Sequence, residues 1–142
     1  ELPMLSIADL GILRDVDAAG DRAVVTITPT YSGCPATDAI RDDLILAFTS
    51  AGFAEIEVRV VLSPAWTTDW LTDTGRRILA EHGIAPPGPR RAAGPIPVSL
   101  GVKCPRCGSL ATRELSRFGS TACKALYECR SCLEPFDHFK AH

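Results

Sequence analysis

The alternation of apolar and polar positions predicts three strands in the first part of the chain. Residues 22–28 are rich in β-branched side chains, which favour a strand. Residues 10–16 predict a weaker strand, and residues 18–21 predict the hairpin turn that joins the two. Residues 55–62 alternate charged and apolar side chains before becoming fully apolar, a pattern typical of a half-buried strand.

Two further segments carry the spacing of amphipathic helices. In residues 36–51 the apolar positions recur on one helical face. Residues 67–82 predict a second helix, with Thr67 or Thr68 as its N-cap and Gly83 at its end. The order strand, strand, helix, strand, helix predicts an α+β domain, a small three-stranded mixed sheet with helices.

A proline-rich segment separates two parts of the chain. Residues 84–97 hold five of the eleven prolines, a density that favours an extended, semi-rigid spacer. We therefore place a first domain at 1–83, a proline-rich linker at 84–97 and a second domain at 98–142.

Composition and charge narrow the functional classes. With 46% hydrophobic and 23% charged residues, the chain has a globular composition. No apolar run approaches the roughly 20 residues that span a bilayer, which argues against a membrane protein. Residues 1–102 carry 13 acidic against 8 basic side chains, and residues 103–142 carry 4 against 7. This weakly basic tail lacks the dense basic surface of nucleic-acid-binding domains, so the charge does not favour that function.

The C-terminal cysteines predict a metal site. Two C-x-x-C pairs are separated by 21 residues, and each pair can hold one ion from a tight knuckle. A segment this short usually needs a metal to fold. We predict a zinc ribbon with one structural zinc ion and a reducing, cytoplasmic location. The four ligands are Cys104, Cys107, Cys129 and Cys132.

Several alternatives to this site stay open. The same spacing could hold iron in a rubredoxin-like site or form disulfides, and Leu133 replaces the glycine that commonly follows such a knuckle. His138 and His142 could replace a cysteine ligand, although a packing or surface role is favoured for both. Cys123 could be a fifth, exchangeable thiolate or fill the core of the ribbon, and we favour packing.

The sixth cysteine, Cys34, stands alone before the first predicted helix. Pro35 suits the first helical turn, which places Cys34 at or beside the N-cap. Helix amides there favour the thiolate that attacks electrophiles and binds soft metals. A lone cysteine is also commonly a small buried apolar residue, so spacing alone does not decide its role.

Trp66 and Trp70 are the two tryptophans of the sequence and lie four residues apart at the start of the second predicted helix. They predict either a stripe of the core or a docking patch for a partner protein.

Four ordered elements resemble the metal–sulfur cluster assembly-factor family: ELP at 1–3, IADLG at 7–11, TPTYSGCP at 28–35 and PAWT at 64–67. The resemblance covers about residues 1–83. It implies that Cys34 handles a cluster, with Asp9 and, more weakly, Glu1 and Thr37 at neighbouring positions.

The C-terminal segment makes the resemblance more specific. FGSTACKALYEC at 118–129 and EPFD at 134–137 resemble the accessory-subunit family of bacterial phenylacetyl-CoA epoxidases, which joins such an assembly domain to a zinc ribbon. The resemblance implies a non-catalytic maturation factor of phenylacetate catabolism. Such a factor would help assemble or deliver an iron–sulfur cluster, or iron, to the reductase or oxygenase component. The chain agrees in lacking the paired Glu-x-x-His motifs of a di-iron bundle.

Three other functions remain to be weighed. The protein could be a structural adaptor that bridges epoxidase components, with Cys34 merely buried. A nucleic-acid-binding ribbon is disfavoured by its charge, and an enzyme with Cys34 as nucleophile is least favoured because no histidine is near it in sequence. A cluster held by Cys34 needs further ligands, which makes a homodimer one way to supply them.

Overall fold

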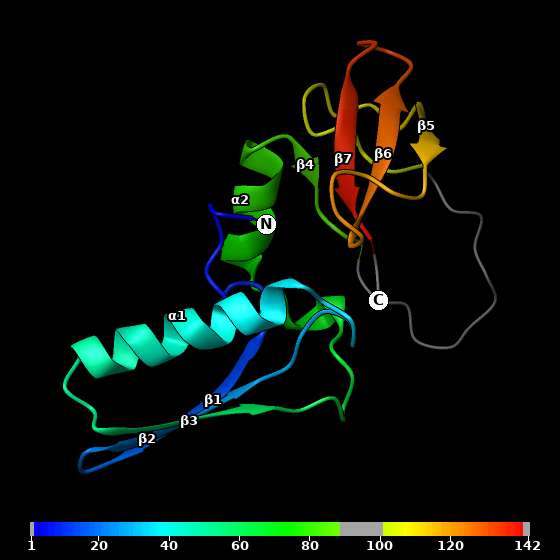
Figure 1. Cartoon of the computed structure of the whole chain (residues 1–142). Coiled ribbons are helices and arrows are strands. Elements are labelled where there is room, and N and C mark those ends of the chain that lie inside the picture. Colours follow the sequence, from blue (N-terminus) through cyan, green and yellow to red (C-terminus); the bar gives the residue numbers. More distant parts are fainter. Residues whose placement is uncertain (1, 89–100, 141–142) are drawn as a thin grey trace.

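The computed structural model describes residues 2–88 and 101–140, which fold into two sheets and two α-helices (Figure 1). No helix in these residues is long and apolar enough to cross a membrane. The α+β class predicted from the sequence is confirmed. The elements in chain order are β1 (Leu13–Ala19), β2 (Arg22–Ile27), α1 (Ala36–Ser50), β3 (Glu55–Val60), the 3-10 helix η1 (Thr68–Trp70), α2 (Asp73–Glu81), β4 (Ile84–Ala85), β5 (Thr112–Ser116), β6 (Lys124–Cys129) and β7 (Pro135–Phe139).

The first sheet has the predicted mixed topology. Its order is β1-β2-β3, with β2 antiparallel to β1 and parallel to β3. Val25 pairs with Val16 on one side and Val58 on the other, so the three side chains share one face of the sheet. Figure 1 shows α1 lying along a face of this sheet. The half-buried Leu44 and Phe48 of α1 pack on the core that contains Val25 and Val58, as the helical spacing predicts.

The first strand begins three residues later than predicted. Leu10 and Ile12 are buried in a turn ahead of β1, where they join the core without pairing as a strand. Gly11, between them, adopts a φ of 67°, and a Cβ added there would lie 2.5 Å from the Trp70 Cβ. This close approach requires glycine, and its left-handed backbone ends the extended conformation before Leu13.

The predicted helix 67–82 is divided into η1 and α2. Thr67 caps η1 through a hydrogen bond that its side chain accepts from the amide of Asp69. Leu71 and Thr72 are extended, because the side chain of Leu71 is buried in the core at 4% exposure. Burial of this leucine therefore outweighs the helical propensity of the surrounding residues, and α2 starts anew at Asp73.

Asp9 and Thr72 fix the start of α2. The Thr72 hydroxyl accepts from the amide of Gly75 at 2.9 Å and donates to the Asp9 carboxylate at 2.9 Å. The Thr72 amide donates to the backbone carbonyl of Asp9, and the Ser6 hydroxyl donates to its carboxylate at 2.6 Å. The hydroxyl donors, Ser6 first and then Thr72, lower the pKa of Asp9. Asp9 thus joins the N-terminal segment to the second helix.

The second sheet begins inside the predicted linker. Ile84 and Ala85 form β4, which is parallel to β7 in a four-stranded sheet of order β4-β7-β6-β5. Both residues are buried, so the chain enters the ribbon directly after α2, at the start of the segment predicted to be a spacer. Of that linker, residues 89–97 lie outside the described residues.

The two domains share one hydrophobic core. Phe139 and Cys123 of the ribbon and Ile84 of β4 belong to the same buried cluster as Val25 of the first sheet. Phe139 is 1% exposed, and its ring meets that of Trp66 edge-on, with 6.0 Å between centroids. In Figure 1 the amino-terminal end of α1 points toward the ribbon. The ribbon therefore completes the core of the first domain.

Phe139→Ala tests this shared core. The variant removes a buried ring and should lower the free energy of unfolding by about 3–5 kcal/mol. The matched control is Phe118→Ala, because the Phe118 side chain is 73% exposed in the same sheet domain and its loss should cost within about 0.5 kcal/mol. Urea unfolding monitored by tryptophan fluorescence measures both. Equal stabilities of the two variants would contradict the shared core.

Candidate metal centre and thiol pocket

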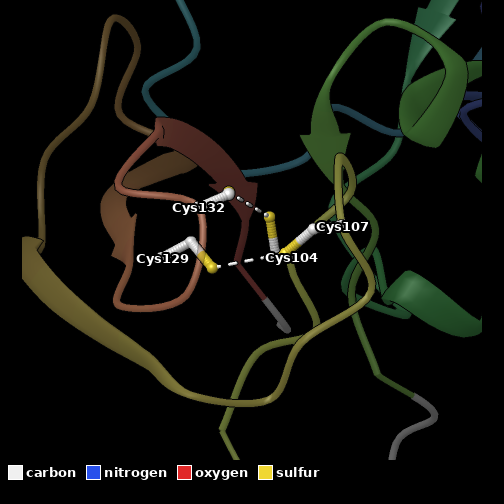
Figure 2. A group of neighbouring side chains, drawn as sticks. All are labelled: Cys104, Cys107, Cys129 and Cys132. Carbon is white, nitrogen blue, oxygen red and sulfur yellow. Dashed lines mark hydrogen bonds between the residues drawn. The ribbon is translucent and has the colours of Figure 1, made fainter.

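Four cysteines from the two ribbon knuckles converge on one point. Figure 2 shows Cys104 and Cys107 facing Cys129 and Cys132. All four sulfur atoms lie within 4.8 Å of one another, and the cross-knuckle distances are 3.8 Å for Cys104–Cys132 and 3.5 Å for Cys107–Cys129. The structure thus brings together the four ligands that the sequence predicts.

The two knuckles repeat the same backbone turn. In the first, the Gly108 amide donates to the Cys104 carbonyl at 2.9 Å; in the second, the Leu133 amide donates to the Cys129 carbonyl at 3.0 Å. The residue that closes each turn is left-handed, with φ of 75° at Gly108 and 63° at Leu133. Leu133 stands where such a knuckle commonly has glycine. The turn is unchanged by this leucine, but the leucine adopts a conformation that glycine prefers.

The tetrad fits a tetrahedral metal ion. Zinc–sulfur bonds of about 2.3 Å in a tetrahedron separate the sulfurs by about 3.8 Å, close to both cross-knuckle distances. Amides within the second knuckle, that of Cys132 first and then that of Ser131, donate to the Cys129 sulfur and lower the pKa of that thiol to about 6 despite its burial. Four thiolates leave no open coordination position, so an ion here is structural.

The ribbon's own core is built around these cysteines. Among the described residues, this core has four buried members: Cys104, Cys129, Ala85 and Phe136. So small an apolar cluster does not by itself offset the conformational entropy of ordering the ribbon. Two of its four buried residues are cysteines of the tetrad, so an ion bound there would stabilise the ribbon directly.

The histidines considered as alternative ligands are not in the tetrad. His138 lies on β7, where its Nδ1 is 3.2 Å from the Ala85 carbonyl and its ring meets Tyr127 edge-on. Desolvation by burial lowers its pKa, which favours the neutral ring. His138 thus packs between strands, and His142 lies outside the described residues.

Cys34 lies in the wall of a pocket of about 280 Å³. The residue is one position before the N-cap, Pro35, and its amide donates to the Tyr31 carbonyl at 3.2 Å. Its side chain is partly buried. The pocket is lined largely by apolar side chains of the N-terminal segment, of α1 and of the ribbon, among them Leu2, Leu5, Ile7, Ile40, Cys123 and Phe139.

The other positions predicted near Cys34 do not join it in the wall of the pocket. Asp9 is absent from the pocket wall and binds Ser6 and Thr72 instead. The Thr37 amide donates to the Cys34 carbonyl at 3.2 Å, and Thr37 does not line the pocket either. Glu1 lies outside the described residues.

Of the two alternatives for the tryptophans, Trp66 takes the place in the core and is not available as a docking residue. It is 5% exposed, and its indole N–H donates to the Leu10 carbonyl at 2.9 Å. Its ring lies in the interior of the shared core. Trp70 is half-buried, with the Arg14 guanidinium 3.6 Å from the centroid of its ring.

Sequence reasoning did not find Cys123 as a neighbour of Cys34. The two cysteines line one pocket from different domains, although the sequence places Cys123 inside the ribbon segment. Nothing in their spacing indicates this, because the shared pocket depends on how the ribbon packs on the first domain.

Exchanging the residues that close the knuckles should change stability in opposite directions. Leu133→Gly relieves the left-handed leucine and should raise the free energy of unfolding by about 1 kcal/mol, whereas Gly108→Ala should lower it by about 1–2 kcal/mol. A Cβ at Gly108 meets nothing closer than 3.5 Å, so the loss is conformational and not steric. Denaturant titration of the metal-loaded protein checks both signs, and a stabilised Gly108→Ala would refute the argument.

Removing the metal should unfold the ribbon and weaken the first domain with it. A strong chelator, or Cys104→Ser, should abolish metal binding and lower the unfolding temperature, because Cys123 and Phe139 then leave the shared core. Cys34→Ser is the control, since Cys34 is outside the tetrad and should leave the metal content unchanged. Metal analysis and circular dichroism measure the effect. If the protein keeps its melting temperature after the chelator has removed the metal, the ribbon does not depend on the ion.

Comparison with known proteins identifies both halves. Residues 1–60 match the family model described as iron-sulfur cluster assembly protein, and residues 92–140 match that described as PaaD zinc beta ribbon domain. A Porphyromonas gingivalis protein named "Fe-S protein maturation auxiliary factor" is 32% identical over 75 residues, which are 51% of this chain and 70% of that protein. The crystal structure of a "domain of unknown function DUF59" from Bacillus anthracis is 31% identical, with a TM-score of 0.49, and the match covers 56% of this chain and 78% of that one.

One relative matches almost the whole chain. An Escherichia coli K12 protein, named as a putative subunit of 1,2-phenylacetyl-CoA epoxidase, is 50% identical over 140 residues, which are 99% of this chain and 84% of that protein. The two family models are matched in the same order as the two domains of the fold. This chain therefore belongs to the PaaD family of 1,2-phenylacetyl-CoA epoxidase subunits, and it joins an iron–sulfur cluster assembly domain to a zinc β-ribbon.

Proposed function

We propose that this protein is a non-catalytic maturation factor of a phenylacetyl-CoA epoxidase. In this proposal it acts in the cytoplasm and helps assemble or deliver an iron–sulfur cluster, or iron, to the reductase or oxygenase component. Two relatives support the two parts of the statement: one is named as a subunit of that epoxidase and the other as an Fe-S protein maturation auxiliary factor.

The observation that carries the proposal is the position of Cys34. It is a free thiol in the wall of a pocket, beside the amino-terminal end of α1, in the domain that matches the cluster-assembly model. Thiolates are the preferred ligands of iron–sulfur clusters. The residues lining this pocket include no histidine, and the exposed His82 is 2.8 Å from the Ile78 carbonyl at the end of α2. This arrangement favours binding of a cargo over catalysis by an activated cysteine.

The ribbon has a supporting part in the proposal. We assign zinc to the tetrad because tetrahedral sites of four thiolates typically hold zinc and the ribbon matches a zinc-ribbon family. The ion holds the ribbon against the first domain and takes no part in transfer. Asp9 then acts as a positioning residue, since it ties the segment that lines the pocket to α2.

A second function, that of a structural adaptor between epoxidase components, is favoured by exposed apolar side chains of the first domain. Ile45 and Leu46 on α1 are 39% and 67% exposed, and together with Leu62 at 55% they leave apolar side chains on the outside of the first domain. Aliphatic residues of this kind suit a protein interface. An adaptor would need these residues and not the thiol of Cys34.

The metal content of the client proteins tests the first function. The reductase and oxygenase components are purified from cells that carry wild-type protein, Cys34→Ala or the control Ser32→Ala, which alters an exposed residue of the same loop. Cys34→Ala should lower the iron and sulfide content of one component several-fold, because the ligand for the cargo is lost, and Ser32→Ala should not.

The component that loses metal identifies the client. Equal protein levels and equal melting temperatures of the two variants show that the loss is chemical and not a failure to fold. Full iron and sulfide in both components from Cys34→Ala cells would contradict the maturation role and leave the adaptor as the better explanation.

A further inference from the structure

The six cysteines divide into a closed site and an open one. Four form the tetrad, and the remaining two, Cys34 and Cys123, both line the pocket of about 280 Å³. Cys34 comes from the loop before α1, and Cys123 comes from the turn directly before the ribbon strand β6. Two soft ligands from different domains therefore face one largely apolar space.

The loop before β6 is built to hold its shape. The Gly119 amide donates to the Lys124 carbonyl at 2.9 Å, and a Cβ added at Gly119 would lie 2.8 Å from an Asp137 carboxylate oxygen. The Lys124 side chain is buried, with its ammonium 3.3 Å from Asp137, and the Ser120 hydroxyl donates to the same carboxylate at 3.1 Å. A buried ion pair with an added hydrogen bond fixes the neighbourhood of Cys123.

The Cys123 side chain has one polar contact: its sulfur is 3.1 Å from the Thr121 hydroxyl. Its backbone carbonyl accepts from the Lys140 amide at 3.0 Å, which fixes the main chain at this position. The side chain is 6% exposed and lines the pocket that Cys34 also lines. The contact with the Thr121 hydroxyl therefore holds the Cys123 sulfur in place at the pocket.

We propose that Cys34 and Cys123 together bind one iron of a [2Fe–2S] cluster carried as cargo. This inference rests on the proposed maturation role and assigns its second ligand. Thiolates are the ligands this cluster takes, and largely apolar walls limit the access of water to its sulfides. The second iron stays accessible to thiols of the donor or client, so the site can release what the closed tetrad cannot.

Loading and transfer are ligand exchanges without a change of oxidation state. When the cluster arrives on two glutathione thiolates per iron, Cys34 and Cys123 replace one such pair. The two iron–sulfur bonds to glutathione break, two to the protein form, and the protons of the two cysteines pass to the released glutathiones. The second protein thiol also removes the need for another copy of the chain to supply it.

Loading from a glutathione-bound [2Fe–2S] cluster tests the pair. The full-length, zinc-loaded protein is mixed anaerobically with the preformed cluster, and bound iron and visible absorption are measured after gel filtration. Wild type should bind the cluster, whereas Cys34→Ser and Cys123→Ser should each lose roughly tenfold or more of the affinity, since even supporting contacts of a metal site are worth that much. The double variant should lose little beyond either single one.

The outcomes separate this inference from the proposed function. If Cys123→Ser loads as wild type does while Cys34→Ser fails, the paired site is wrong and the role of Cys34 stands. If wild type takes up no cluster, or if both variants load normally, the paired site is refuted. The metal content of the client components then decides the maturation role separately.

A test on the native chain covers the case in which Cys123→Ser fails to fold. Phenylarsine oxide condenses with two adjacent thiols to form two arsenic–sulfur bonds and one water. It should bridge Cys34 and Cys123 while zinc protects the other four cysteines. Mass spectrometry of the digest should find the two peptides joined through arsenic, and their absence as a joined species would overturn the inference. Thr121→Val, which keeps both thiols, should weaken cluster binding without loss of zinc.

Discussion

The convergence of four thiolates is the constraint on which the rest of this structure depends. Without an ion between them, the knuckles lose the bonds that join them, and the ribbon keeps a small apolar cluster of its own and the residues that it contributes to the shared core. With the ion, β6 and β7 are held as a hairpin, and that hairpin carries Phe139 into contact with Trp66. The core of the first domain and one wall of the Cys34 pocket therefore depend on a metal site in another domain.

The protein uses the same chemical group in two opposite settings. The tetrad can surround an ion completely, and the left-handed turns at Gly108 and Leu133 fix its geometry. The pocket at Cys34 is partly open, and its walls belong to three separate segments of the chain. In the proposed function, a permanent ion needs the first arrangement, and a cargo that is received and passed on needs the second, because incoming thiols must reach the metal.

Local sequence signals located most elements but not every boundary. Strand and helix patterns gave β2, α1 and β3 within two residues, since these elements have a regular buried face. They were wrong for the helix 67–82, which breaks where Leu71 is buried, and for the linker, whose first residues form β4. In both places burial against a distant segment decided the backbone conformation, and no local pattern reports such a contact.

The sequence by itself determined which cysteines form the tetrad and which one stands alone before a helix. The spacing of the C-x-x-C pairs fixed the tetrad, and the GCP loop placed Cys34 before a helix, because both depend on residues close in the chain. Only the tertiary structure decided that Trp66 is buried, that Asp9 secures α2, and that Cys123 and Cys34 line one pocket. These contacts join segments far apart in sequence, and they arise from the packing of a metal-held ribbon against an otherwise incomplete core.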